Sequence, residues 1–194
     1  MRVLIFSLLL LGAGATLAQQ PTSPQFKGGV FDPPRPAPAF ALPASGGAPV
    51  RLADYRGKVV VLEFGFSHCA AVCPVSLASL AQAKQQLGAR GKDVQVLFIT
   101  VDPARDTPER LRTYLAQFEP SFVGITGSDA QIGQLLKDYG ISAAKHPVKD
   151  SNEYSMSHSS YLYFIDRQGR QRAMMPFGRP AADIAHDLAI LLNQ

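Results

Sequence analysis

The sequence predicts an α/β domain in which helices cover a mostly parallel central sheet. Two segments, KVVVLEFGF at 58–66 and VQVLFITV at 94–101, are continuous apolar runs typical of strands that are covered on both faces. A helical pattern follows each of them, and the chain ends in a hairpin and a further helix. This order is typical of a layered α/β fold, and 194 residues that are 46% hydrophobic suffice for one such domain.

The other elements are justified by local signals. Proline suits a first helical turn, a Ser or Thr side chain caps the turn, and glycine ends a helix. The domain is expected to begin with two short strands within 40–58 and strand 58–66, followed by a helix from about Pro74 to Leu87 and strand 94–101. Next come a helix over 109–118 capped by Thr107, strand 121–126, and a helix from the Ser128 and Gln131 capping box to Gly140. The chain then forms hairpin strands 161–166 and 170–177 and a helix from Pro180 to about Leu192.

The N-terminus has the pattern of a secretory signal peptide over residues 1–18. Arg2 precedes an apolar run, and small residues end at Ala18. The run is shorter than the ~20 residues of a spanning helix, which favours cleavage after Ala18 over an uncleaved anchor. We therefore expect a periplasmic protein, free or held at the inner membrane. Residues 19–39, rich in Pro and Gly, are expected to form a tether, and residues 40–194 the domain.

The charge pattern argues against a nucleic-acid partner. The chain carries 19 basic and 15 acidic residues, and one basic residue, Arg2, lies in the signal segment, so the exported chain has a net charge of +3. These charges are scattered, and no long basic run is present. A mixed solvated surface is the simpler interpretation.

The stretch GFSHCAAVCP at 65–74 contains the two cysteines of the chain, Cys69 and Cys73. They follow strand 58–66 at its carboxyl end, where ligands bind in parallel sheets. Residues four apart share a helix face, and a helix N-terminus favours thiolate, so both thiols are expected to have low pKa values. In an oxidising compartment an idle pair would form a disulfide unless reduction or a metal prevents it.

Three interpretations of this CxxxC pair compete. A structural disulfide fits the ~6 Å between helical Cα atoms four apart, but it would close a small loop that adds little stability. A thioredoxin-type oxidoreductase has two residues between its cysteines and a proline before the closing hairpin, whereas residues 148–175 contain no proline. A metal site is the third interpretation, and it needs at least one more ligand.

His158 is the best candidate for that ligand. It stands in a predicted loop directly before the hairpin strand, which the sheet would return beside the cysteines. Cys69, Cys73 and His158 suit a thiophilic metal, with copper and zinc leading. A structural zinc site needs a fourth fixed ligand, whereas Cu(I) accepts three, but the spacing alone leaves both open.

Weaker candidates surround this set. His68 is adjacent to Cys69, so its side chain should diverge and serve a supporting role. Asp102 ends strand 94–101 and is expected near the site, while Asp106 is interpreted as a helix-start residue. Met156 and the two later methionines are soft enough for Cu(I), but methionine is more often a core residue.

The segments GFSHCAAVCP, ITVDPARDTPERLRTYL and SHSSYLYFID together resemble the Sco/SenC family of copper chaperones for the binuclear copper centre of cytochrome c oxidase. The resemblance covers most of residues 40–192, and the combination of CxxxCP, VDPxRDTP and a late His-Ser is specific. It implies a thioredoxin-like fold with a central mixed sheet flanked by helices and an N-terminal β-hairpin extension.

The resemblance also implies a site. The copper ligands fall on Cys69, Cys73 and His158, with one copper per chain as Cu(I), Cu(II) or both, and the cysteines are redox-active and must be reduced before loading. Asp102 falls on a position that supports the site or a partner contact. The family often has Pro-Asp between the cysteines, where this chain has Ala70 and Ala71, a departure that removes a charge beside the metal.

The expected function is that of a metallochaperone, which needs no catalytic residues. Its partners would be the copper-centre subunit of cytochrome c oxidase, or another copper acceptor, and a thiol reductant. The alternative is an enzyme, a thiol-disulfide reductase that keeps the cysteines of a partner's copper site reduced. A peroxidase, which would need a rapidly oxidised cysteine, is a third and weaker hypothesis.

Overall fold

A computed structural model describes residues 25–194. The predicted signal peptide and the first residues of the predicted tether lie outside this range. Among the described helices, none has the length and apolar character required to cross a membrane.

The centre of the fold is a six-stranded mixed sheet. Its order is β1 (Gly29–Pro36), β10 (Arg170–Pro176), β9 (Tyr161–Ile165), β4 (Val59–Gly65), β5 (Val94–Thr100) and β6 (Val123–Ile125). The strands β4, β5 and β6 pair in parallel, whereas β9, β10 and β1 are each antiparallel to their neighbours. The predicted α/β class and the mixed sheet implied by the family resemblance are confirmed. The expectation of a mostly parallel sheet is wrong, because three of its five strand pairings are antiparallel.

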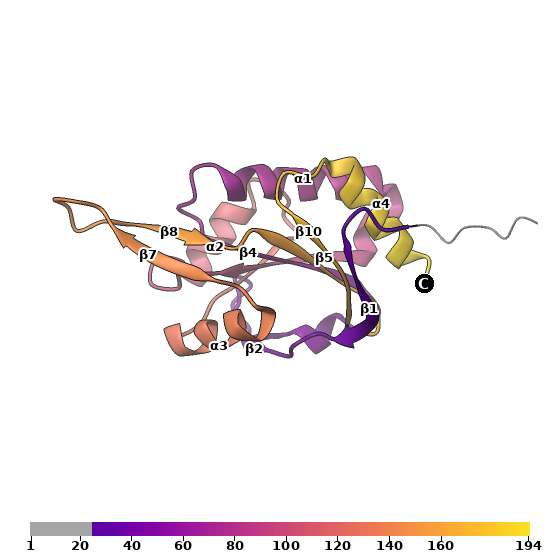
Figure 1. Cartoon of the computed structure of the whole chain (residues 1–194), viewed down its shortest axis with the longest axis horizontal. Helices are drawn as coiled ribbons and strands as arrows, with labels where there is room; N and C mark the ends of the chain where they lie inside the picture. The colour runs from indigo at the N-terminus through magenta and orange to yellow at the C-terminus, as the bar shows by residue number, and fades with distance from the viewer. Residues whose placement is uncertain (1–24) are drawn as a thin grey trace, which may run out of the picture.

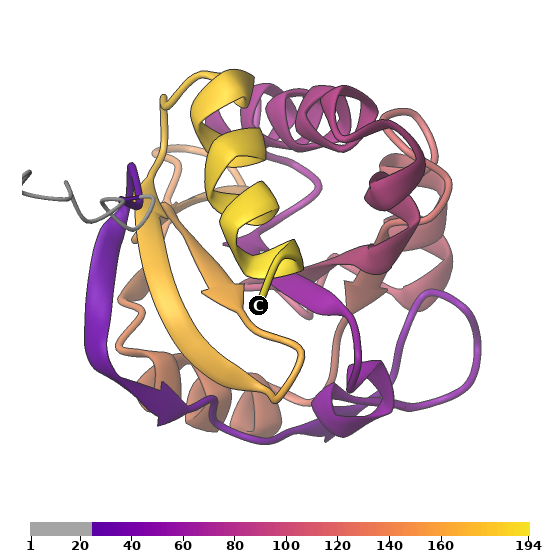
Figure 2. The ribbon, with the colours of Figure 1, turned by 90° about the vertical axis from the view of Figure 1, so that its right-hand side faces the viewer.

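Helices cover both faces of the sheet. Helices α1 (Val72–Gln86) and α4 (Ala181–Leu192) pack together on one face, while α3 (Asp129–Tyr139) lies on the other (Figures 1 and 2). Helix α2 (Pro108–Leu115) packs against β6. Phe64, Phe98 and Phe164, from three neighbouring strands, are among the largest fully buried side chains. Burying such aromatic side chains supplies much of the hydrophobic stabilisation.

The helix ends follow the predicted capping chemistry, with small shifts. Thr107 Oγ1 accepts the Arg110 N–H at 3.2 Å, and the capping box at Ser128 is present. Helix α1 begins at Val72, two residues before Pro74, and α4 begins one residue after Pro180. Both prolines still lie where no intrahelical N–H is required.

The N-terminal part of the described chain takes part in two strand pairings. Strands β2 (Ala41–Leu42) and β3 (Val50–Arg51) form the predicted N-terminal hairpin. Strand β1, by contrast, lies within the expected tether and pairs with β10 at the sheet edge, which Figure 2 shows clearly. Proline is tolerated on an edge strand because one side of the strand has no partner to receive an N–H. Residues 29–36 are therefore part of the domain.

A second, unpredicted hairpin consists of β7 (Ala143–Pro147) and β8 (Tyr154–His158). It extends away from the body of the protein as an arm (Figure 1). His158 is the last residue of β8, so the prediction that it lies in a loop is wrong. The arm has mostly polar residues, and it therefore lacks the apolar run from which a buried strand is predicted.

Candidate metal centre

The two cysteines are placed by the turn from β4 into α1. Cys73 is the second residue of the helix and is 1% exposed, while Cys69 is half-buried in the preceding loop. Both are free thiols. The Cys73 N–H donates to Cys69 Sγ at 3.4 Å. Gly65, at the end of β4, leaves space for the Cys73 side chain, because a Cβ at position 65 would lie only 2.8 Å from Cys73 Sγ.

His158 presents a ring nitrogen to Cys73. Its Nε2 lies 3.9 Å from Cys73 Sγ, and its Nδ1 lies 3.0 Å from the carbonyl oxygen of Ser159. A carbonyl oxygen only accepts, so in the neutral ring Nδ1 carries the proton and Nε2 keeps its lone pair. Phe66 packs edge-on against the ring at 5.8 Å between centroids. The histidine is thus oriented as a metal-ligating histidine is, with its second nitrogen bonded to the backbone.

The predicted ligands adjoin one another without forming a finished ligand set. Among residues 25–194, no group of three or more His, Cys, Asp or Glu side chains is arranged to hold a metal ion. His158 stands between two spaces. A small, partly open cavity of about 10 Å³ is lined by Cys73 and His158, and a wider open groove of about 630 Å³ is lined by Cys69 and His158.

The two thiols differ in acidity. Burial raises the pKa of Cys69, but the N–H groups of Cys73, Ala71 and Val72 and the Cys73 thiol outweigh it and lower the pKa overall. At Cys73, burial raises the pKa far above its usual range, and the Glu63 carboxylate, once ionised at alkaline pH, adds to the effect. The prediction of two low-pKa thiols is therefore wrong for Cys73, because burial there outweighs the one lowering contribution, a hydrogen bond with the backbone of Phe66.

Glu63 is a buried carboxyl group that sequence analysis missed. It lies on β4, is 4% exposed and lines the same small cavity as Cys73 and His158. Its Oε2 has no hydrogen-bond partner. Burial raises the pKa of Glu63 to about 8, although a hydrogen bond with Ser76 partly opposes this. The group is therefore mostly protonated at neutral pH.

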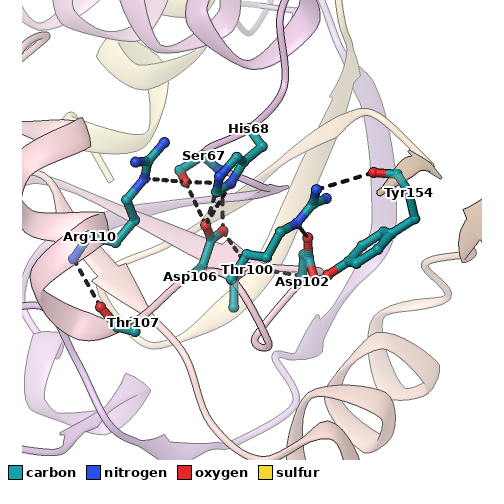
Figure 3. Close-up of polar contacts among 9 residues, drawn as sticks. Ser67, His68, Thr100, Asp102, Asp106, Thr107, Arg110 and Tyr154 are labelled. Atoms are coloured by element: carbon teal, nitrogen blue, oxygen red, sulfur yellow. Dashed lines mark hydrogen bonds and ion pairs between the residues drawn. The ribbon is translucent and has the colours of Figure 1, made fainter. Parts of the chain in front are cut away.

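Asp106 braces the loop that leads to Cys69 (Figure 3). Its fully buried carboxylate accepts the Ser67 hydroxyl at 2.6 Å, the Ser67 N–H at 3.1 Å and the Thr100 hydroxyl at 2.6 Å. Arg110 Nε donates to Ser67 Oγ at 3.0 Å. The interpretation of Asp106 as a helix-start residue missed this long-range role. We call Asp106, Ser67 and Thr100 the Asp106 brace. The ring of His68 lies close to it, with Nδ1 3.9 Å from the Asp106 carboxylate.

Asp102 holds the β7–β8 arm to the body. Its fully buried carboxylate accepts the Tyr154 hydroxyl at 2.7 Å and Arg105 Nε at 2.5 Å. Arg105 also donates to the Tyr154 carbonyl oxygen at 3.1 Å, and its guanidinium lies 3.9 Å from the centre of the Tyr154 ring. We call Asp102, Arg105 and Tyr154 the clasp. Because Tyr154 is four residues before His158 on β8, the clasp fixes the strand that carries the histidine.

Comparison with known proteins identifies the family. The family model for SCO1/SenC matches residues 32–193, which is most of the chain. The chain belongs to the SCO1/SenC family. It is 32% identical to a SCO2-like protein of Rickettsia prowazekii over 178 residues, 87% of this chain and 86% of that protein.

Two further comparisons extend this result. The chain is 40% identical to the mitochondrial SCO2 homolog of Bos taurus over 119 residues, 60% of this chain but 45% of the bovine protein, so it spans about half the length of that relative. The structure of Bradyrhizobium japonicum ScoI with copper bound superposes with a TM-score of 0.74 at 34% identity, covering 80% of this chain and 98% of ScoI.

The clasp leads to a first prediction for this SCO1/SenC domain. Tyr154→Phe keeps the ring against Arg105 but leaves the buried Asp102 carboxylate without its hydroxyl donor. We expect a loss of about 1–2 kcal/mol in stability and faster amide hydrogen exchange across residues 143–158. Hydrogen exchange followed by mass spectrometry would measure this, with Tyr161→Phe as the matched control. Unchanged protection of the arm would show that the hydroxyl does not hold it.

Proposed function

We propose that this SCO1/SenC protein is an exported copper metallochaperone. One copper ion is bound by Cys69, Cys73 and His158 and is passed to an acceptor, the binuclear copper centre of cytochrome c oxidase. The main support is the orientation of His158, whose Nε2 lone pair faces the Cys73 sulfur at 3.9 Å. The signal-peptide pattern of residues 1–18 supports a periplasmic location.

The donor set fits copper. Two thiolates and an imidazole are soft to intermediate ligands, which suit Cu(I), and Cu(I) is stable with three of them. ScoI, which shares the fold, is a copper-bound protein, and BsSco, another structural neighbour, is described as a member of the Sco family of cytochrome c oxidase assembly proteins. These likenesses support copper as the cargo and cytochrome c oxidase as the destination.

The acidity of the thiols suggests an order of loading. Cys69 borders the open groove and has the lower pKa, so it supplies the first thiolate. Cys73 follows by releasing its proton as its sulfur bonds to the metal. The positive charge of the metal then neutralises the buried thiolate in place of the proton. The Asp106 brace fixes the cysteine loop and the clasp fixes the arm, so the ligands approach from two anchored elements.

Copper affinity tests the proposal directly. The reduced protein is titrated anaerobically against a competing Cu(I) chelator, beside His158→Ala. We expect one tightly bound Cu(I) per chain in the wild type. Removing a residue that only hydrogen-bonds to a metal ligand lowers metal affinity by up to roughly 100-fold, so removing a direct ligand in His158→Ala should lower the Cu(I) affinity by more than that. Unchanged stoichiometry and affinity in His158→Ala would remove the third ligand, and absence of tight binding in the wild type would refute the metallochaperone.

The thiol asymmetry favours a second candidate, a thiol-disulfide reductase. Cys69 as thiolate would attack a partner disulfide, form a mixed disulfide and release one partner thiolate. Cys73 would then lose its proton, attack Cys69 and release the second partner thiolate, so the partner is reduced and this pair is oxidised. This function predicts ready exchange with glutathione and an activity indifferent to His158→Ala, which separates it from copper transfer.

A further inference from the structure

Strand β8 turns one methionine toward the candidate metal centre. Alternate residues of a strand point to the same side. Tyr154 faces the body through its bond to Asp102, and His158 faces it through its contact with Cys73. Met156 stands between them, so its side chain points the same way. The burial pattern agrees, because these three residues are half-buried and the intervening Ser155 and Ser157 are exposed.

Met156 borders the groove rather than filling the centre of the core. Cys69, Met156 and His158 all line the open groove of about 630 Å³. Met175, by contrast, is fully buried within the sheet core. Part of the Met156 side chain contacts the core. Among the residues that line the groove, Met156 is the one that carries a thioether. The Cys69 thiol and the His158 imidazole, both predicted to bind copper, therefore share one open surface with a soft thioether.

Thioether sulfur is a ligand that prefers Cu(I) to harder ions. We propose that the Met156 thioether is an additional donor to Cu(I) on the groove side of the site, beside Cys69 and His158. This inference rests on the proposed copper-binding function. The thioether is neutral and binds without losing a proton, so it adds a ligand that an incoming acceptor reaching through the groove can displace. Met156 thus holds the ion at the side from which it enters and leaves.

The test compares methionine variants and observes the sulfur position directly. Met156→Leu keeps the apolar volume but removes the donor, and Met174→Leu, on β10 outside the groove, is the matched control. Cu(I) affinity is measured on the reduced full-length or exported chain by chelator competition. In parallel, selenomethionine-labelled protein loaded with Cu(I) is examined by X-ray absorption at the selenium edge, where a selenium–copper distance is visible only if a methionine binds the metal.

We expect Met156→Leu to weaken Cu(I) binding by about tenfold, while Met174→Leu binds like the wild type. We also expect selenium–copper scattering in the labelled wild type that disappears in labelled Met156→Leu. Thermal unfolding of both variants checks that they fold. If the wild type binds one Cu(I) tightly but shows no selenium–copper scattering and Met156→Leu binds equally well, the inference fails and the proposed function stands. If the wild type binds no Cu(I), the proposed function itself fails.

Discussion

Iodoacetamide should alkylate Cys69 of the reduced, metal-free protein at least about a hundred times faster than Cys73 at pH 7.5. The thiolate is the reacting species, and its fraction falls about tenfold for each unit by which the pKa exceeds the pH. Cys69 is half-buried at the edge of a groove and has a lowered pKa, whereas Cys73 is 1% exposed and has a raised pKa. Access and acidity therefore act in the same direction.

Peptide mass spectrometry of quenched samples measures the two rates separately. Denaturant provides the first control, because the two cysteines should react at similar rates once the chain is unfolded. Cys73→Ser provides the second, since Cys69 keeps the backbone N–H of residue 73 and should stay reactive. Similar rates for both thiols in the folded protein would contradict the assigned acidities and the loading order built on them.

The sheet core could be predicted because its sequence signals are local. Strands β4 and β5 appear as continuous apolar runs, and α2 and α3 start at recognisable caps. Strand β1 could not be predicted, because its prolines are untypical of a strand and because it pairs with β10, a strand more than a hundred residues later. The β7–β8 arm was missed because it lies outside the core and therefore carries few apolar residues.

The candidate site divides in the same way. The ligand candidates could be predicted from the sequence, because cysteine and histidine are rare in it and the topology returns the histidine toward the cysteines. These candidates are Cys69, Cys73 and His158. The clasp joins Asp102 to Tyr154, 52 residues apart, and the brace joins Ser67 to Asp106, 39 residues apart. No local pattern reports such bonds. The one signal available for Glu63 was an acidic residue inside an apolar strand.

Glu63→Gln should stabilise the protein at neutral and alkaline pH. Burial raises the pKa of Glu63 from 4.5 to about 8 in the folded state, so between these values the folded chain holds a proton that the unfolded chain has released. Stability therefore falls as the pH rises from about 4.5 to about 8 and then levels off. Glutamine is neutral throughout and of similar shape, so it escapes this cost, which is on the order of 3 kcal/mol at pH 7.

Urea unfolding at pH 5 and at pH 8 tests the sign as well as the size. The advantage of Glu63→Gln should be small at pH 5 and should grow by a few kcal/mol at pH 8. Glu153→Gln, at an exposed position of the arm, is the matched control and should show no comparable growth. An equal pH dependence in the wild type and Glu63→Gln would mean that the folded carboxyl titrates normally. Growth as predicted would show that the cavity beside Cys73 disfavours negative charge, which is the same physical reason that burial raises the pKa of the Cys73 thiol.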